Sequence, residues 1–211
     1  MMGYPEYTKV IIAIVAIINP LGAVPLFLSL TSGETPQEQK RIAKITAISV
    51  AVILIFSVWT GEPFLQFFGI SVSAFRVAGG LLVLLMGVAM IHGHMSHAKH
   101  TPAEDKEAQG KDSVAVVPLA IPLIAGPGAI SLVIMDSHNA ETVTNKLLLS
   151  AGIVVVAALV WVILYIAKSI SKILGTTGIN IFTRVMGLLL AAIGIEFITG
   201  GLRELLPGLG K

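Results

Sequence analysis

The sequence has 211 residues, of which 55% are hydrophobic and 12% are charged, and its mean hydropathy is +0.90. Soluble domains carry about 25% charged residues, so this composition predicts an integral membrane protein. The net charge of +2, without a basic patch, argues against nucleic acid binding. The absence of cysteine excludes disulfides and thiolate metal sites.

Six apolar stretches approach or exceed the roughly 20 residues that a helix needs to cross hydrocarbon. We therefore predict an all-α integral membrane protein with six transmembrane helices. In chain order they cover residues 8–30, 42–59, 72–91, 113–135, 147–167 and 179–198. The first stretch is longer than the core of a signal peptide, so we expect it to be retained.

The first and fourth stretches are each interrupted by proline and glycine, at residues 19–25 and 126–131. Proline inside a helix costs about 3 kcal/mol, and within a membrane such breaks persist where protein or water surrounds them. A helix that restarts there offers N–H groups to an anion such as a carboxylate. We predict that helices 1 and 4 are discontinuous and bind substrate at their breaks; simple kinks in packed helices are the alternative. The candidate substrate-binding residues are Asn19, Pro20, Leu21, Gly22, Ala23, Gly126, Pro127, Gly128 and Ala129.

The two halves of the chain match one another in the same order of motifs. The offset is 106 positions at the breaks and at a glycine turn, and 108 positions at an Arg-Val-x-Gly motif. The matching pairs are Gly22 with Gly128, Gly69 with Gly175, and Arg76 with Arg184. Because each half holds three predicted spans, the second half is expected to cross the membrane upside down.

This pattern predicts one membrane domain built as a 3+3 inverted repeat. Residues 1–92 form the first repeat, 93–112 a polar cytoplasmic loop, and 113–211 the second, inverted repeat. Inverted repeats with broken helices are typical of secondary transporters, in which the substrate lies between the repeats near the middle of the bilayer.

Three charged residues within or near the spans have candidate roles. Arg76 and Arg184, as symmetry mates, are expected to act as structural anchors or gating ion pairs, with anchoring at the lipid headgroups as the simpler alternative. Glu196 could carry a coupling proton, pair with a basic group, or be solvated at the interface. Asn19 could hold substrate or cap the restarted helix.

Four histidines follow the third span and offer a second hypothesis. His92, His94, His97 and His100 have a spacing that can bind a transition metal, although a solvated polar loop is the simpler interpretation. No metal site within the membrane and no cofactor are predicted.

The distribution of Lys and Arg predicts the orientation in the membrane. Most of these residues lie in the connectors after spans 1, 3 and 5, which places those connectors in the cytoplasm and both termini outside. The residues in these connectors are Lys40, Arg41, Lys44, Lys99, Lys106, Lys111, Lys168 and Lys172, against Lys9, Lys146, Arg203 and Lys211 on the other side.

Several of these motifs together resemble the MarC family, and in particular its small neutral amino acid transporter (SnatA-like) branch. They are Asn19-Pro20-Leu21-Gly22-Ala23-Val24-Pro25, Phe68-Gly69-Ile70, Arg76-Val77-Ala78-Gly79-Gly80, Ala125-Gly126-Pro127-Gly128-Ala129-Ile130 and Arg184-Val185-Met186-Gly187-Leu188. The resemblance implies a protein of the cytoplasmic membrane that transports glycine, alanine and similar amino acids, driven by a gradient of H⁺ or Na⁺.

The sequence thus favours a carrier that works by alternating access on a small neutral amino acid. A transition-metal or other cation exporter that uses the histidines is the main alternative. A membrane enzyme is disfavoured because no catalytic set of residues is evident, and a passive channel is a further alternative. The direction of transport, the coupling ion and the oligomeric state, a homo-oligomer included, stay open.

Overall fold

The computed structural model describes residues 4–93, 115, 119–120, 124–140 and 142–210, and each regular element within them is helical. The prediction of an all-α protein is confirmed for this part of the chain. The elements are α1 (Tyr4–Ile18), α2 (Val24–Leu30), α3 (Pro36–Phe67), α4 (Val72–Ile91), α6 (Pro127–Asn139), α7 (Val143–Tyr165), α8 (Ala167–Leu205) and a 3₁₀ turn, η2 (Pro207–Gly210).

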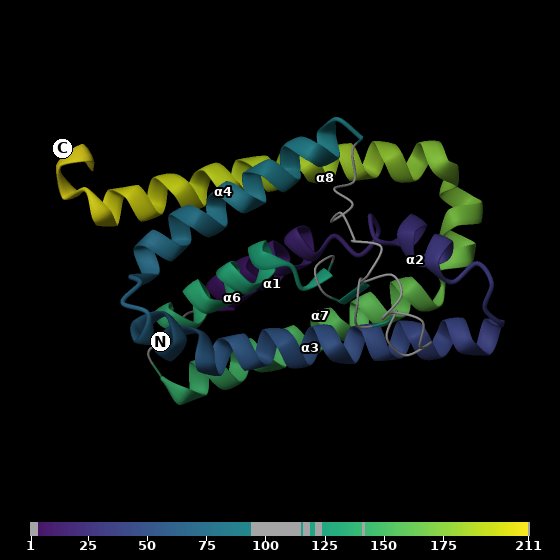
Figure 1. Cartoon of the computed structure of the whole chain (residues 1–211), viewed down its shortest axis with the longest axis horizontal. Coiled ribbons are helices and arrows are strands. Elements are labelled where there is room, and N and C mark those ends of the chain that lie inside the picture. Colours follow the sequence, from purple (N-terminus) through teal and green to yellow (C-terminus); the bar gives the residue numbers. More distant parts are fainter. Residues whose placement is uncertain (1–3, 94–114, 116–118, 121–123, 141, 211) are drawn as a thin grey trace.

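The helices lie roughly along the long axis of the molecule in three groups (Figure 1). The long helices α4 and α8 pack together on one side, and α3 and α7 pack together on the other. The short helices α1 and α6 lie between these pairs, and α6 contacts both α3 and α4. The core of the protein is therefore built around the two short helices.

Four helices, α3, α4, α7 and α8, are long and apolar enough to cross a membrane, and α1 carries a shorter apolar stretch. They coincide with the second, third, fifth and sixth predicted spans, and the bounds of α4 agree with the prediction at both ends. The first predicted span is divided into α1 and α2. Within the fourth, α6 begins only at Pro127, and most of the residues from 113 to 123 lie outside the described part.

Hydrogen-bonding side chains set the starts of three long helices. At the start of α3, Thr35 accepts a bond from the Glu38 N–H, and the Glu38 carboxylate accepts one from the Thr35 N–H in return. Ser71 and Thr142 cap α4 and α7 in the same way, each accepting from the N–H three residues ahead. These caps satisfy amide groups that the helix itself leaves without a partner.

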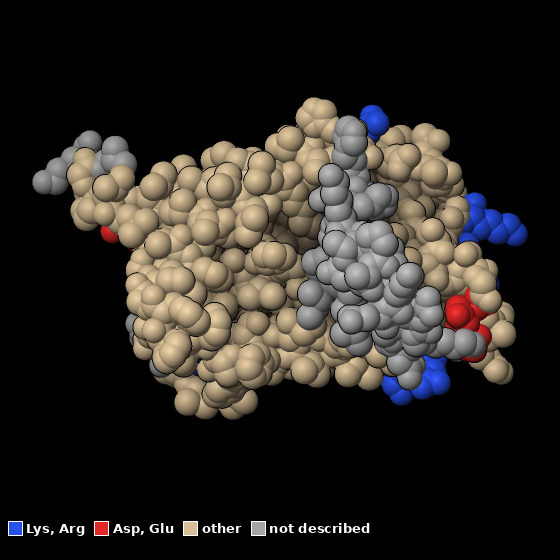
Figure 2. Space-filling model, in the orientation of Figure 1, with Lys and Arg blue, Asp and Glu red and all other residues tan. Residues whose placement is uncertain are grey.

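Large apolar side chains cover the outside of the long helices, as expected for contact with lipid. Phe56, Val155 and Leu188 are 66%, 63% and 65% exposed, whereas Leu54 and Ile153 on the inner faces are fully buried. Soluble monomers rarely expose apolar surface on this scale. On the face in Figure 2, basic side chains gather toward the right-hand end beside a few acidic ones, and the described surface to their left is almost free of charge.

Helices α4 and α8 approach one another at glycines on both sides of the contact. A Cβ atom placed on Gly87 would lie 2.6 Å from the Gly187 carbonyl oxygen, and one on Gly187 would lie 2.8 Å from the Gly87 oxygen. Gly80 and Gly194 face each other in the same reciprocal way, with distances of 2.8 and 2.7 Å. The small-residue spacing seen in the sequence therefore allows backbone-to-backbone packing of these helices.

Two glycines at corresponding positions have left-handed backbones that other residues rarely adopt. Gly69, between α3 and α4, has φ 68°, and Gly175, within α8, has φ 61°. Gly175 bends α8 into two helical parts, since its ψ of 178° is not helical. The sixth predicted span begins after this bend.

Replacing Gly87 or Gly194 with alanine is expected to lower the melting temperature of the detergent-purified protein, because the new methyl group would meet the partner backbone. Such over-packing costs about 1–3 kcal/mol, and alanine regains only about 1 kcal/mol over glycine inside a helix. Gly33→Ala is the control, since nothing lies within 4 Å of its Cβ position. Equal melting temperatures in all these variants would contradict the close contact.

Candidate functional site

Helix α1 ends because Asn19 turns out of it into the left-handed region, with φ 44°. The Asn19 N–H still donates to the Val15 carbonyl at 2.9 Å, but Pro20 has no N–H and cannot bond to the carbonyl of Ala16. Asn19 is the one non-glycine residue with positive φ in the described part of the chain. The C-terminal end of α1 therefore keeps a carbonyl that the helix does not use.

The turn after α1 is closed by its own hydrogen bonds. The Asn19 side-chain oxygen accepts from the Gly22 N–H at 3.3 Å, and its backbone oxygen accepts from the Ala23 N–H at 3.2 Å. The Val24 N–H donates to the Leu21 carbonyl, also at 3.2 Å. A Cβ atom on Gly22 would overlap the Asn19 amide, so glycine is needed for this turn. The Asn19 side chain therefore closes the turn before α2 and does not form the predicted cap of the restarted helix, because Ala23 is the N-cap residue of α2 and no side chain caps that helix.

The second break is open where the first is closed. Gly126 is extended, with φ −75° and ψ 176°, and α6 begins at Pro127 without a capping side chain. The Ile130 N–H is bound to the Gly126 carbonyl at 3.1 Å, and proline has no N–H. The first turn of α6 therefore presents the N–H groups of Gly128 and Ala129, and both of these residues are buried.

The two breaks meet near the middle of the long axis, where α1 ends and α6 begins and the two helices run in opposite directions (Figure 1). A Cβ atom on Gly128 would lie 3.5 Å from Cγ2 of Ile17 and 2.7 Å from Cγ2 of Val83. The C-terminal end of α1 and the N-terminal end of α6 are thus adjacent. Their dipoles present partial negative and partial positive charge, respectively, to the same region.

Helix α6 packs into small residues of α3 and α4. Ser131, which is 2% exposed, lies against Gly79 of α4, and Ile134 lies against Gly61 of α3, so closely that a Cβ atom on either glycine would overlap it. Gly79 belongs to the Arg-Val-x-Gly motif, but its contact with Ser131 was not predicted. The glycines of α4 therefore serve two neighbours, α6 on one face and α8 on the other.

The predicted charged residues have different environments. Arg76 forms an ion pair with Glu204 of α8 at 2.9 Å, and Ser73 donates to the same carboxylate at 2.6 Å. Arg184 is exposed near the end of α4, with Nη2 3.7 Å from the Cβ position of Gly93. Glu196 is exposed on α8. The two arginines lie at opposite ends of the α4–α8 pair, as their symmetric positions in the sequence predict.

Two further ionisable groups at the Arg76 end were missed by the sequence analysis. Asp136 of α6 is largely buried, and its Oδ2 atom has no hydrogen-bond partner in the described part of the chain. His138 pairs with Glu62 of α3 at 2.9 Å between Nδ1 and Oε1. Asp136 directly follows the fourth predicted span, which ends at residue 135. An acidic residue at the end of a membrane span was the feature of the sequence that could have identified it.

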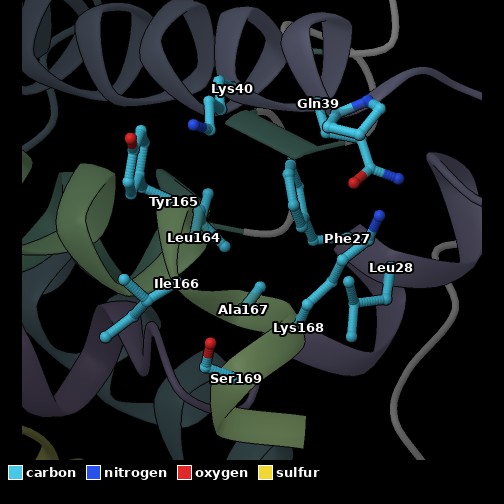
Figure 3. A pocket seen from close by; sticks show the side chains of 11 residues that line it. Phe27, Leu28, Gln39, Lys40, Leu164, Tyr165, Ile166, Ala167, Lys168 and Ser169 are labelled. Atoms are coloured by element: carbon cyan, nitrogen blue, oxygen red, sulfur yellow. The ribbon is translucent and has the colours of Figure 1, made fainter.

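A separate pocket of about 80 Å³ opens at the other end of the molecule, between α2, α3, α7 and the start of α8 (Figure 3). Lys40 and Lys168 line it, and the Lys40 ammonium lies 4.6 Å from the centre of the Tyr165 ring. None of the predicted substrate-binding residues lines this pocket. The pocket therefore marks the basic end of the protein and not the two breaks.

The histidine hypothesis falls mainly on residues outside the described part of the chain, which omits His94, His97 and His100. His92 ends α4 and donates through Nδ1 to the Val88 carbonyl at 2.8 Å. Among the described residues, no group of three or more His, Asp or Glu side chains is arranged to hold a metal ion.

Comparison with known families decides the relationship of this chain. Residues 4–206 match the model of the MarC family integral membrane proteins. The chain belongs to the MarC family. This finding confirms the resemblance at the level of the family, and the multi-pass membrane fold fits it. No solved structure matches the chain.

Relatives of this MarC protein occur in bacteria and archaea. The UPF0056 membrane protein YhcE of Escherichia coli is 40% identical, with 98% of this chain and 96% of the relative covered. The UPF0056 membrane protein YvbG of Bacillus subtilis is 36% identical, with 98% of each covered. The UPF0056 membrane protein MJ1677 of Methanocaldococcus jannaschii is 39% identical, with 90% and 93% covered.

We expect Asn19→Ala to destabilise the protein more than Asn19→Gly. Both variants lose the bond to the Gly22 N–H, but only alanine is also strained at φ 44°, by about 1–2 kcal/mol. The melting temperatures of the two purified variants measure this difference. If they agree, the left-handed backbone is not what this position requires.

Proposed function

We propose that this MarC protein is a secondary transporter that moves small neutral amino acids of the glycine and alanine class across the cytoplasmic membrane by alternating access. The observation that carries the proposal is the contact between the end of α1 and the start of α6, at Ile17 and Gly128. Secondary transporters commonly bind substrate where two broken helices meet near the middle of the bilayer.

The chemistry of the two helix ends suits a zwitterion. The N–H groups of Gly128 and Ala129 would receive the carboxylate, because α6 begins there without a side-chain cap. The carbonyl of Ala16, which Pro20 cannot satisfy, would receive the ammonium group at the negative end of α1. The carboxylate is assigned to the second break because the turn at the first break already uses the N–H groups of Gly22, Ala23 and Val24.

The size and charge of the substrate follow from the same residues. Gly126 and Gly128 let the backbone approach a ligand closely and leave room for only a short side chain. Neither break has a charged residue next to it in the sequence, which favours a ligand without net charge. Glycine and alanine meet both conditions.

Alternating access would use the two halves as a 3+3 inverted repeat of six transmembrane helices. Its supports are the corresponding bends at Gly69 and Gly175 and the reciprocal glycine contacts between α4 and α8. The basic residues at the pocket end, including Lys40 and Lys168, favour a cytoplasmic location for that end, with both termini outside. A gradient of H⁺ or Na⁺ would drive the cycle.

Gly128→Ala combined with Val83→Ala separates a role in binding from a role in packing. The alanine at position 83 removes the methyl group that lies 2.7 Å from the Cβ position of Gly128. We therefore expect the double variant to melt within a few degrees of the wild type but to take up labelled glycine into proteoliposomes poorly, with a raised KM.

Val83→Ala alone is the matched control and should keep both its fold and most of its uptake. A double variant that folds and transports like the wild type would refute the proposed site. Wild-type protein that shows no uptake or exchange of glycine or alanine would refute the proposed substrate. Loss of metal tolerance on deletion of residues 93–100, with no amino acid transport, would favour the cation exporter instead.

A further inference from the structure

Asp136 lies on α6 between the second break and the end of the protein at which Arg76 and Glu204 are paired. It lies eight residues beyond Gly128 on α6, which is about 12 Å along the helix axis at 1.5 Å per residue. From there α6 runs toward the end of the molecule where the chain turns into α7 and where α8 ends (Figure 1). Asp136 is therefore on the same rigid helix as the proposed carboxylate-binding groups.

The packing of α6 on α4 brings Asp136 to the level of Arg76. Gly128 lies against Val83 and Ser131 lies against Gly79, so the two helices run antiparallel, and the same register carries Asp136 to the turns of α4 that hold Arg76. The two side chains do not form an ion pair of the kind that Arg76 makes with Glu204. In the described part of the chain, both Asp136 Oδ2 and Arg76 Nε are buried without a hydrogen-bond partner. A carboxylate and a guanidinium at the same level of the α4–α6 contact thus each retain a buried polar atom without a partner in the described part of the chain.

The carboxylates of α3 and α8 at this end are already paired. Glu204 of α8 is bound to Arg76 and half exposed, and Glu62 of α3 is bound to His138. From α1 and α7, Lys9 is exposed and Lys146 is half-buried. Asp136 is accordingly the carboxylate at this end that has a buried oxygen without a hydrogen-bond partner in the described part of the chain.

We propose that Asp136 binds and releases the proton that couples a proton gradient to transport. The inference rests on the proposed function, and it makes H⁺ the coupling ion. When ionised, Asp136 is attracted to Arg76 and so holds α6 against α4. Because Arg76 is also paired with Glu204, the same attraction links α6 to α8. When Oδ2 takes up a proton from the outer solution, the carboxyl group is neutral and this attraction is lost. Movement of α6 then carries Gly128 and Ala129 with it.

This role fits Asp136 better than Glu196, the carboxylate singled out in the sequence. Glu196 is exposed on α8 and is not on either broken helix, so its protonation has no direct route to the breaks. Asp136 has a buried carboxylate oxygen, lies at the level of Arg76 and is on the helix that forms the site. An ionisable residue in such a place within a membrane protein is a functional candidate by default.

The first test needs no substrate and uses the natural absence of cysteine. Ser131→Cys places a single thiol on the buried face of α6, and its reaction with a water-soluble thiol reagent is measured in acidic and alkaline buffer. Rates are divided by those of Gly33→Cys, which is exposed, to remove the intrinsic pH dependence of the thiol.

We expect the corrected rate to rise in acid when Asp136 is present, and to be high at all pH values after Asp136→Asn. Glu62→Gln is the matched control, because Glu62 is a carboxylate at the same end that is paired with His138, and it should keep the wild-type response. A corrected rate that is independent of pH in the wild type, or equally dependent on pH after Asp136→Asn, would overturn the inference.

The second test follows transport in proteoliposomes. Asp136→Asn should retain exchange of labelled for unlabelled glycine but lose accumulation driven by a pH gradient, while Glu62→Gln keeps both. Accumulation that survives in Asp136→Asn, or that follows a Na⁺ gradient instead, overturns the proton assignment and leaves the proposed function standing. If neither glycine nor alanine is exchanged by the wild type, the proposed function fails, and the thiol measurement still decides whether Asp136 is a proton-controlled contact.

Discussion

The need to satisfy every backbone amide and carbonyl away from water governs this structure. Hydrocarbon offers no hydrogen bonds, so a chain that leaves its helix inside a membrane must find partners in the protein or in a ligand. In the turn after α1 the hydrogen-bond partners come from the turn itself, namely the Asn19 side chain and the backbone of residues 19–24. The start of α6 does not, since Pro127 and Gly126 supply no cap for the amides that follow. The central region therefore has a partial negative charge at the end of α1 and uncapped amide groups with a partial positive charge at the start of α6.

Close packing keeps these breaks in place. Glycines let α4 touch α8 through their backbones, and the same helix offers Gly79 to Ser131 of α6. Because van der Waals contact and hydrogen bonds replace the hydrophobic effect as the force between membrane helices, small residues at such contacts have a large effect on which helices pair. The short helices α1 and α6 are thus enclosed by long ones, and their ends meet at Ile17 and Gly128.

Two groups of charged side chains lie toward opposite ends of the protein and are organised differently. The basic residues around Lys40 and Lys168 border an open pocket, and Tyr165 lies beneath the Lys40 ammonium. At the other end Arg76 joins α4 to α8 through Glu204, and Asp136 of α6 has a buried carboxylate oxygen without a partner in the described residues. The proposed protonation of Asp136 would change how three helices hold together, which is the kind of two-state contact that coupled transport requires.

The sequence by itself determined the membrane class, the bounds of α4 and the positions of both breaks, because long apolar runs and proline act locally on the backbone. It also pointed to Gly69 and Gly175, whose turns need a left-handed residue. Only the tertiary structure decided which break keeps open amides and where the charged groups go. Arg76 and Glu204 are 128 positions apart, and Asp136 comes from a third helix. Contacts of that kind depend on how helices pack, and no local pattern of residues encodes them.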